Sequence, residues 1–333
     1  MTQPSVSILL PIFNGAKHLQ AAIESILRQT HADFELILID DASTDSTLDV
    51  IQSFTDPRIV VLKQLRNHGM AAALNLGIDV AQGEFLARMD ADDLALPQRL
   101  EKQIEFMQAH PEVGVCGTQM RHFGELRGVY RKPLAHDMIM AMMLIEPVMR
   151  HPTVMLRRCL LARFDFRYDA FFEVAQDYDL WTRMIQKTRF ANLPEVLLQY
   201  RCEGQNNSFV KHTLRDQATY RIRKRFVESI LEREATDDEA SFHHRFANGH
   251  ATDRESLENA EDWITTLRRA NQMSRRCDAI QLKRVLAYLW CMNAAGKQIA
   301  WRMFQPLTRP DFCATAIRGY LPQIFSGIVN TVR

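Results

Sequence analysis

The chain has 333 residues, enough for one large domain with a smaller appendage or for two modest domains. Its 41 Lys and Arg residues against 40 Asp and Glu residues leave almost no net charge, which argues against a dedicated nucleic-acid-binding protein. The six cysteines are widely spaced and form no C-x-x-C pair. Neither a zinc site nor a disulfide framework is indicated, and we expect free thiols.

The N-terminal segment has neither the basic start nor the small-residue cleavage site of a secretory signal. No stretch reaches the roughly 18 uninterrupted apolar residues that a membrane-spanning helix needs. We therefore expect a cytoplasmic protein, with peripheral contact at the inner face of the membrane left open.

The apolar pattern of residues 6–93 predicts strands that alternate with helices. The apolar run at 6–10 predicts a strand closed by Pro11, and apolar residues then recur at helical spacing between Leu19 and Leu27. The alternation continues with predicted strands at 34–39, 58–62 and 84–89. Of the predicted helices, one ends at Phe54, one spans 70–81 with Gln82-Gly83 as its C-cap, and one begins at Pro97. This pattern specifies an α/β fold with a mostly parallel central sheet.

The remainder of the chain is less regular. We expect a strand at 113–119 and a helix that contains 179–185, and long charged helical segments beyond about residue 205. The predicted division is a catalytic domain at 1–208 and a mainly α-helical C-terminal region at 209–333.

The loop after the first predicted strand is unlike the common nucleotide-binding loops, because neither G-x-x-x-x-G-K-[ST] nor G-x-G-x-x-G occurs there. It offers Pro11, Phe13 and Asn14 instead, which can hold a base through the backbone and an aromatic ring. The simpler interpretation is a strand stopped by proline before an asparagine turn.

Three carboxylates, Asp90, Asp92 and Asp93, follow the fourth predicted strand. In open α/β sheets, ligands bind at the carboxyl ends of strands. Hard divalent cations bind one or two carboxylates together with substrate phosphates, so an Asp-x-Asp there can bridge a metal to a diphosphate. The alternative is an acidic helix cap, for which one Asp suffices. Because clustered carboxylates repel one another, the metal site is favoured, and Asp93 either supports it or caps the turn.

A second acidic motif surrounds Asp177 at a predicted helix start. Asp177 can serve as a general base, or it can cap the helix with Asp179 facing solvent. From the pattern alone the cap is favoured. His151 precedes a proline and an apolar run, and an isolated histidine is more often structural than functional.

Taken in order, these pieces resemble the family 2 glycosyltransferases of GT-A fold, which transfer sugars from nucleotide-diphosphate donors with inversion. The resemblance covers about residues 5–208. It rests on the ordered set 6–14, 25–30, 35–41, 43–45, 67–69, 73–77, 83–84 and 88–93.

The resemblance implies a site. The residues that would bind the nucleotide sugar are Pro11, Phe13, Asn14, Asp41, Asn67, Arg88, Asp90 and His151. Asp41 would accept a base N–H, and Asp90 and Asp92 would hold Mg²⁺ or Mn²⁺. Asp177 falls where such enzymes place the catalytic base, which reverses the preference for a cap.

The resemblance further implies an inverting, metal-dependent hexosyl- or N-acetylhexosaminyl-transferase that uses a UDP-sugar and a glycan or lipid-linked acceptor in cell-surface polysaccharide or lipopolysaccharide synthesis. Two residues depart from the family pattern: Phe13 replaces a common Tyr, and Gln176 replaces the Glu that usually precedes the base. The segment 281–285 lacks the Trp of the processive synthases, so transfer of a single sugar is expected.

Two alternatives to this function stay open, a sugar-phosphate nucleotidyltransferase and a non-catalytic protein that keeps the fold. The first expects an arginine in the loop 11–15, which has none. The C-terminal segments 285–304 and 314–332 mix aromatic residues with Lys and Arg, so they either lie on a membrane surface or pack on the catalytic domain or a second subunit.

Overall fold

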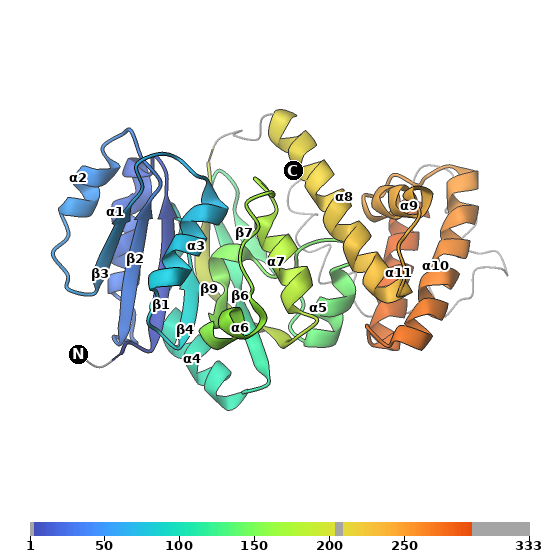
Figure 1. Ribbon diagram of the computed structural model, residues 1–333, viewed down its shortest axis with the longest axis horizontal. Helices are drawn as coiled ribbons and strands as arrows, with labels where there is room; N and C mark the ends of the chain where they lie inside the picture. Colours follow the sequence, from blue (N-terminus) through green and yellow to red (C-terminus); the bar gives the residue numbers. More distant parts are fainter. Residues whose placement is uncertain (1–2, 204–208, 295–333) are drawn as a thin grey trace. The chain divides into compact units, whose positions relative to one another are not determined.

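The computed structural model describes residues 3–203 and 209–294 (Figure 1). The described residues form two compact units, one from 3–134, 149–203 and 209–211 and the other from 135–148 and 212–294. The segment 135–148, which the sequence-based division places in the catalytic domain, thus belongs to the second unit. An α/β unit with a mostly parallel sheet, and a helical C-terminal region, are what the sequence predicts.

The first unit is built on a sheet that has nine strands in the described residues. The strands are β1 Val6–Ile12, β2 Phe34–Asp40, β3 Ile59–Lys63, β4 Phe85–Arg88, β5 Leu94–Ala95, β6 Val113–Gly124, β7 Gly128–Tyr130, β8 Met155–Arg157 and β9 Arg189–Cys202. Their order is β3-β2-β1-β4-β8-β6-β9-β5, and β7 pairs with β6.

The strands β3, β2, β1 and β4 pair in parallel, as the alternating pattern predicts. Residues of β1, β2 and β4 are buried throughout, because helices cover both faces of this part of the sheet. The covering helices are α1 Ala16–Leu27, α2 Thr47–Gln52, α3 Met70–Val80 and α4 Arg99–Ala109 (Figure 1).

Gly83 corrects one expectation. The helix α3 ends at Val80, and its C-cap Ala81 is extended, so Gln82-Gly83 is not the predicted left-handed cap. A Cβ at Gly83 would lie 2.5 Å from the backbone nitrogen of Ser7. This glycine is therefore required by the close approach of the chain to β1, not by a turn.

The strand β8 interrupts the parallel order. It pairs antiparallel with β4 on one side and with β6 on the other, while β6 and β9 are parallel. Because β8 runs against β4, its amino end lies at the carboxyl end of β4. The short helices η1 His151–Thr153, α6 Arg158–Phe164 and α7 Gln176–Met184 connect these strands.

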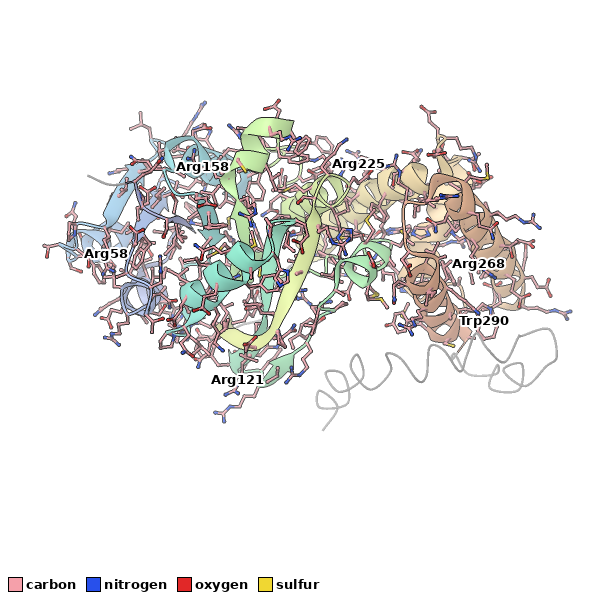
Figure 2. The ribbon with its side chains drawn as sticks, turned by 90° about the horizontal axis from the view of Figure 1, so that it is seen from below. Arg58, Arg121, Arg158, Arg225, Arg268 and Trp290 are labelled. Atoms are coloured by element: carbon pink, nitrogen blue, oxygen red, sulfur yellow. The ribbon has the colours of Figure 1, made fainter. Side chains whose placement is uncertain are left out.

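The second unit is helical. Its helices in the described residues are α5 His136–Met142, α8 Phe209–Leu231, α9 Asp237–Ala247, α10 Arg254–Ser274 and α11 Ala279–Ala294. Figure 2 labels Arg268 on α10 and Trp290 on α11. Trp290 is buried, so it offers no exposed surface to a membrane.

The rest of the proposed membrane-surface segment, from residue 295 onward, lies outside the described residues. Within the part that the structure describes, no helix is long and apolar enough to cross a membrane. Five of the six cysteines are described, and all five are free thiols, as expected.

Candidate functional site

The predicted donor-binding residues gather at the carboxyl ends of β1, β2 and β4, which are neighbours in the sheet. Pro11 lies near the end of β1, Asp41 follows β2, and Arg88 is the last residue of β4. This convergence follows from topology, because parallel strands end at one edge of a sheet.

The loop after β1 is tied to the loop after β2. The Asn14 side chain accepts the backbone N–H of Thr44 at 2.8 Å, and the Asn14 backbone N–H donates to the Ser43 hydroxyl at 2.9 Å. These bonds leave the neighbouring Phe13 side chain 52% exposed at the mouth of the site. An exposed ring beside a fixed backbone suits stacking on a base.

Asp41 is buried, and its carboxylate shapes the next loop. It accepts the backbone N–H groups of His68 and Gly69, at 2.9 and 2.8 Å, and the Gln64 amide at 2.8 Å. Asn67 is exposed, and its side chain accepts the Gly69 N–H of its own turn. Since three bonds to Asp41 come from the protein, its carboxylate has limited capacity left for a base.

Left-handed backbone marks three positions beside the site. Asn14, Ala42 and Ala175 have φ values of 53°, 62° and 60°, and they adjoin Phe13, Asp41 and Gln176. A non-glycine residue held in this region stores of order 1–3 kcal/mol of strain, which surrounding contacts must sustain. Such strain is concentrated at functional sites.

Arg88 is the electrostatic centre of the site. Its side chain is 4% exposed, and its guanidinium forms an ion pair with Asp90. A buried cation requires such a partner, because burial disfavours its charge and the Asp90 carboxylate restores it. The Arg88 charge also acts on His151, Tyr168 and Asp177, so these groups lie near it.

Asp92 and Asp93 differ in their surroundings. The pKa of Asp92 is raised by burial of its carboxyl and by the charge of Asp90, because neighbouring carboxylates repel each other. Asp93 is fully buried, and burial raises its pKa to about 9. One Asp93 oxygen accepts the backbone N–H of Arg201 at 2.9 Å, and the other has no hydrogen-bond partner. Asp93 therefore fastens the loop to β9 and does not cap a helix.

His151 reaches the site because β8 is antiparallel. The chain just before β8 lies against the end of β4, where the Arg88 backbone N–H donates to Val154 at 3.1 Å. The His151 Nε2 is hydrogen-bonded to the Tyr168 hydroxyl at 2.8 Å. Burial, aided by the charge of Arg88, holds the pKa of His151 well below its usual range, so the ring is neutral.

Asp177 lies in the first turn of α7, half-buried. Burial raises its pKa, whereas the backbone N–H of Tyr178 and the charges of Arg88 and Arg150 act in the opposite direction. A carboxyl with a raised pKa is a stronger base once ionised, which suits proton abstraction.

The alternative in which Asp179 faces solvent is wrong. Its side chain is 0% exposed, and it accepts two hydrogen bonds from Arg183 one turn along the helix, at 3.0 and 2.6 Å. The helical periodicity of the sequence does not predict the burial of Asp179. Arg183 makes it possible, because it supplies the compensating charge that lets a carboxylate face the core.

The carboxylates suit a hard cation that shares its ligands with a substrate. Among the described residues, no group of three or more His, Cys, Asp or Glu side chains is arranged to hold a metal. Asp90 and Asp92 supply oxygen ligands whose mutual repulsion a divalent cation would relieve. Mg²⁺ is bound in this way, through one or two carboxylates plus substrate phosphates.

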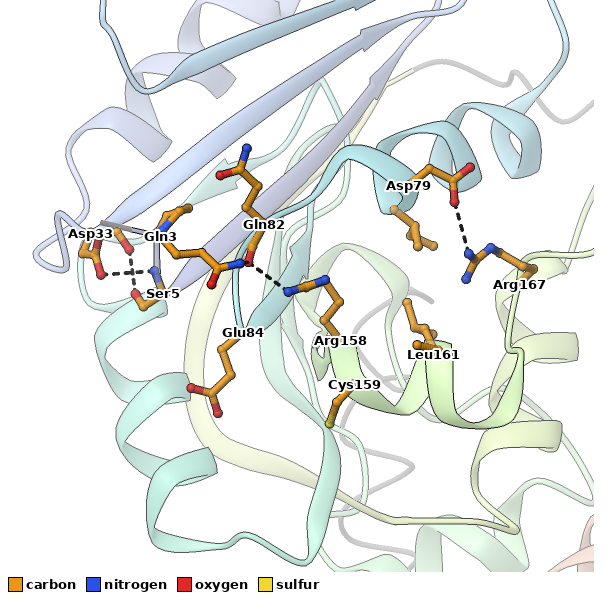
Figure 3. A pocket seen from close by; sticks show the side chains of 13 residues that line it. Gln3, Ser5, Asp33, Asp79, Gln82, Glu84, Arg158, Cys159, Leu161 and Arg167 are labelled. Atoms are coloured by element: carbon orange, nitrogen blue, oxygen red, sulfur yellow. Dashed lines mark hydrogen bonds and ion pairs between the residues drawn. The ribbon is translucent and has the colours of Figure 1, made fainter. Parts of the chain in front are cut away.

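A separate cavity of about 770 Å³ lies at the opposite ends of these strands (Figure 3). It is lined by residues that precede β1, β2 and β4, among them Ser5, Asp33 and Glu84. Its arginines are engaged within the protein, Arg158 with the Gly83 carbonyl at 2.6 Å and Arg167 with Asp79 at 3.1 Å. None of the predicted site residues lines this cavity.

Sequence reasoning missed Tyr168 and Arg150. Tyr168 is held by Asn75 of α3, which donates to its carbonyl at 2.8 Å and accepts its N–H at 3.0 Å. Asn75 belongs to the motif at 73–77, but nothing local in the sequence links it to a residue 93 positions away. Nothing local in the sequence distinguishes Arg150, which directly precedes His151, from a surface arginine.

The comparisons with known proteins identify the family of this chain. The family model "Glycosyl transferase family 2" matches residues 7–172. The chain is 36% identical over 205 residues to "Putative glycosyltransferase EpsE" of Bacillus subtilis, covering 60% of this chain and 73% of that protein. It is 30% identical over 203 residues to "Amylovoran biosynthesis glycosyltransferase AmsE" of Erwinia amylovora, covering 59% and 75%.

Solved structures show the same fold. S. aureus TarS 1-349 in complex with UDP-GlcNAc has a TM-score of 0.60 at 19% identity, with 87% of each chain covered. The mannosyltransferase PcManGT from Pyrobaculum calidifontis, in complex with GDP-Man and Mn2+, has a TM-score of 0.55 at 19% identity, covering 96% of this chain and 87% of that one. With its ordered motifs, its fold and these relatives, the chain belongs to glycosyl transferase family 2.

Proposed function

We propose that this glycosyltransferase moves a single hexosyl or N-acetylhexosaminyl group from a UDP-sugar to a hydroxyl group of a glycan or lipid-linked acceptor, with inversion and with Mg²⁺ or Mn²⁺. One observation carries the proposal: the buried Arg88 at the carboxyl end of β4 pairs with Asp90, and its charge acts on His151 and Asp177 nearby. Candidate metal ligands and a candidate base thus share one site.

The donor would bind across the ends of β1, β2 and β4. Phe13 offers an exposed ring for the base, and Asp41 with Asn67 supports the loop beside it. Asp90 and Asp92 would hold the cation against the diphosphate. When bound, the cation neutralises charge on the departing diphosphate.

Asp177 would take the proton of the acceptor hydroxyl. The acceptor oxygen then forms a bond to the anomeric carbon while the bond from that carbon to the diphosphate breaks, so the configuration inverts. Gln176 leaves the base without a neighbouring carboxylate, and Arg88 and Arg150 favour its ionised form. His151, neutral and bonded to Tyr168, is placed to contact the donor sugar or phosphate.

The biological setting belongs to the same proposal. AmsE is named for amylovoran biosynthesis, and TarS was solved with UDP-GlcNAc. These relatives support a UDP-sugar donor and a role in cell-surface polysaccharide or lipopolysaccharide synthesis. We place the enzyme in the cytoplasm, with peripheral contact at the inner face of the membrane.

Ligand binding to the native state raises apparent stability, so thermal shift with UDP- and GDP-sugars tests the donor. We expect a UDP-sugar to raise Tm in the presence of Mn²⁺ and much less in EDTA. NMR of the product then reports the anomeric configuration. Retention of configuration, or a shift that is independent of metal, would contradict the proposal. Turnover separates this enzyme from a non-catalytic protein that keeps the fold.

A further inference from the structure

A group of aromatic rings lies on β6, β7 and β9 beside the donor site. The His122 ring stacks on Tyr130, with centroids 5.7 Å apart, and meets Tyr200 at 5.6 Å. His122 and Tyr200 face each other in the register of β6 and β9, which fixes this arrangement in the sheet. All three residues are half-buried, so part of each side chain remains accessible.

Arg150 completes this group. Its guanidinium carbon lies 4.2 Å from the centre of the Tyr130 ring. Its Nε is buried without a hydrogen-bond partner, and its guanidinium forms no ion pair with any residue in 3–203 or 209–294. Arg88 and Arg183, by contrast, each form an ion pair with an aspartate, so the Arg150 guanidinium keeps more of its capacity to bind an anion.

The group lies near both the candidate metal ligands and the candidate base. Burial raises the pKa of Tyr200 to about 12, and the next contributions come from Asp90 and Asp93. On the other side, the charge of Arg150 acts on Asp177. An acceptor hydroxyl must reach Asp177, and Arg150 places this surface beside that residue.

We propose that Arg150, with the rings of His122, Tyr130 and Tyr200, is an acceptor subsite for a saccharide that carries a negative charge, either a carboxylate or a phosphate. The planar guanidinium can bind either group through two parallel hydrogen bonds. The rings offer flat apolar faces to the C–H face of a sugar. This inference rests on the proposed transfer reaction and names the class of its acceptor.

A charged sugar is favoured over the donor as the partner of Arg150. The donor phosphates have Asp90 and Asp92 with a cation, and the Arg88 guanidinium beside Asp90 is already paired with that carboxylate. The Lys132 ammonium also lies near this group, 5.0 Å from the centre of the Tyr130 ring. Positive charge without a phosphate role in the donor site suits an anionic acceptor.

The experiment uses the full chain saturated with UDP and Mn²⁺. Binding of tri-galacturonate, neutral galactotriose and galactose 6-phosphate is measured by calorimetry for the wild type, Arg150→Met and Arg150→Lys. Arg121→Met is the matched control, because Arg121 is an exposed arginine on β6 next to His122 in sequence (Figure 2). UDP affinity is measured separately for every variant.

We expect at least one anionic probe to bind the wild type more tightly than galactotriose, and Arg150→Met to weaken it by about tenfold. Arg150→Lys should recover part of the affinity, since it keeps the charge and loses the fork. The probe that binds distinguishes carboxylate from phosphate. UDP affinity and the Arg121→Met variant should not change.

Three results would overturn the inference: equal binding of charged and neutral probes, equal loss in Arg150→Met and Arg121→Met, or no binding of either anionic probe while UDP still binds. A parallel loss of UDP affinity in Arg150→Met would assign Arg150 to the donor instead. Failure of wild-type UDP binding is a distinct outcome, which contradicts the proposed function itself.

Discussion

The two halves of the sheet supply the site by different routes. From β1 to β4, the site residues Pro11, Asp41 and Arg88 lie at or just beyond the ends of parallel strands. In the second half, His151 comes from a 3₁₀ helix and Asp177 from an α-helix, and neither follows a parallel strand.

The difference shows what holds each set in place. Parallel strands deliver their carboxyl ends to one edge by topology, so the first set converges whatever the loops contain. The second set depends on the antiparallel β8 and on particular contacts, such as the bond from Tyr168 to His151. Substitutions in the first half should therefore affect the donor, and those in the second half should affect the chemistry, the acceptor and, through His151, the donor as well.

The largest effect is expected from Asp177→Asn. Loss of a general base lowers turnover by about 10²–10⁴-fold, and UDP affinity should stay unchanged because this residue is not a predicted nucleotide ligand. Asp179→Asn, on the same helix, is the control. It removes a buried partner of Arg183 and should lower the free energy of unfolding by about 1–3 kcal/mol. Wild-type turnover in Asp177→Asn would refute the base assignment.

Asp92→Asn should break the first half of the site. We expect the Mn²⁺-dependent part of UDP affinity to fall by about tenfold or more, because a ligand to the cation is lost. Asp93→Asn keeps an oxygen that can accept the Arg201 N–H, so it should preserve most of this affinity. Titration of UDP with and without Mn²⁺ measures both. An equal loss in the two variants would mean that Asp93 binds the cation.

Tyr168→Phe tests the contact that holds His151 in the second half. Losing the hydroxyl leaves the buried His151 ring without its 2.8 Å partner, which should cost about 1 kcal/mol and lower Tm by a few degrees. The donor KM should rise several-fold, since the ring loses its orientation. Tyr220→Phe is the control, because that ring packs against His244 in the helical unit. Unchanged KM in Tyr168→Phe would remove His151 from the donor site.

The smallest effect concerns pH. Burial raises the pKa of Asp177, so kcat/KM should fall on the acid side at a higher pH than an ordinary aspartate would give. Arg150→Met removes a positive charge that favours the ionised carboxylate, so this acid limb should move to still higher pH. A pH–rate profile of both proteins measures the shift. Movement to lower pH would show that Arg150 does not act on the base.

The sequence by itself determined the parallel half. Apolar runs that alternate with helical patterns predicted the first four strands along the chain. The ends of these strands then identified the positions of Asp41 and Asp90 to Asp93. These signals are local, because burial on both faces requires continuous apolar runs and each strand is followed at once by its loop.

Only the tertiary structure decided the second half. The antiparallel direction of β8 and the contact of Arg150 with Tyr130 depend on partners distant in the chain, and the burial of Asp179 depends on how α7 packs. No periodic pattern in the sequence indicates the hydrogen bonds between Asn75 and Tyr168. A buried charge takes its role from the group that compensates it, and that group is known only when the chain has folded.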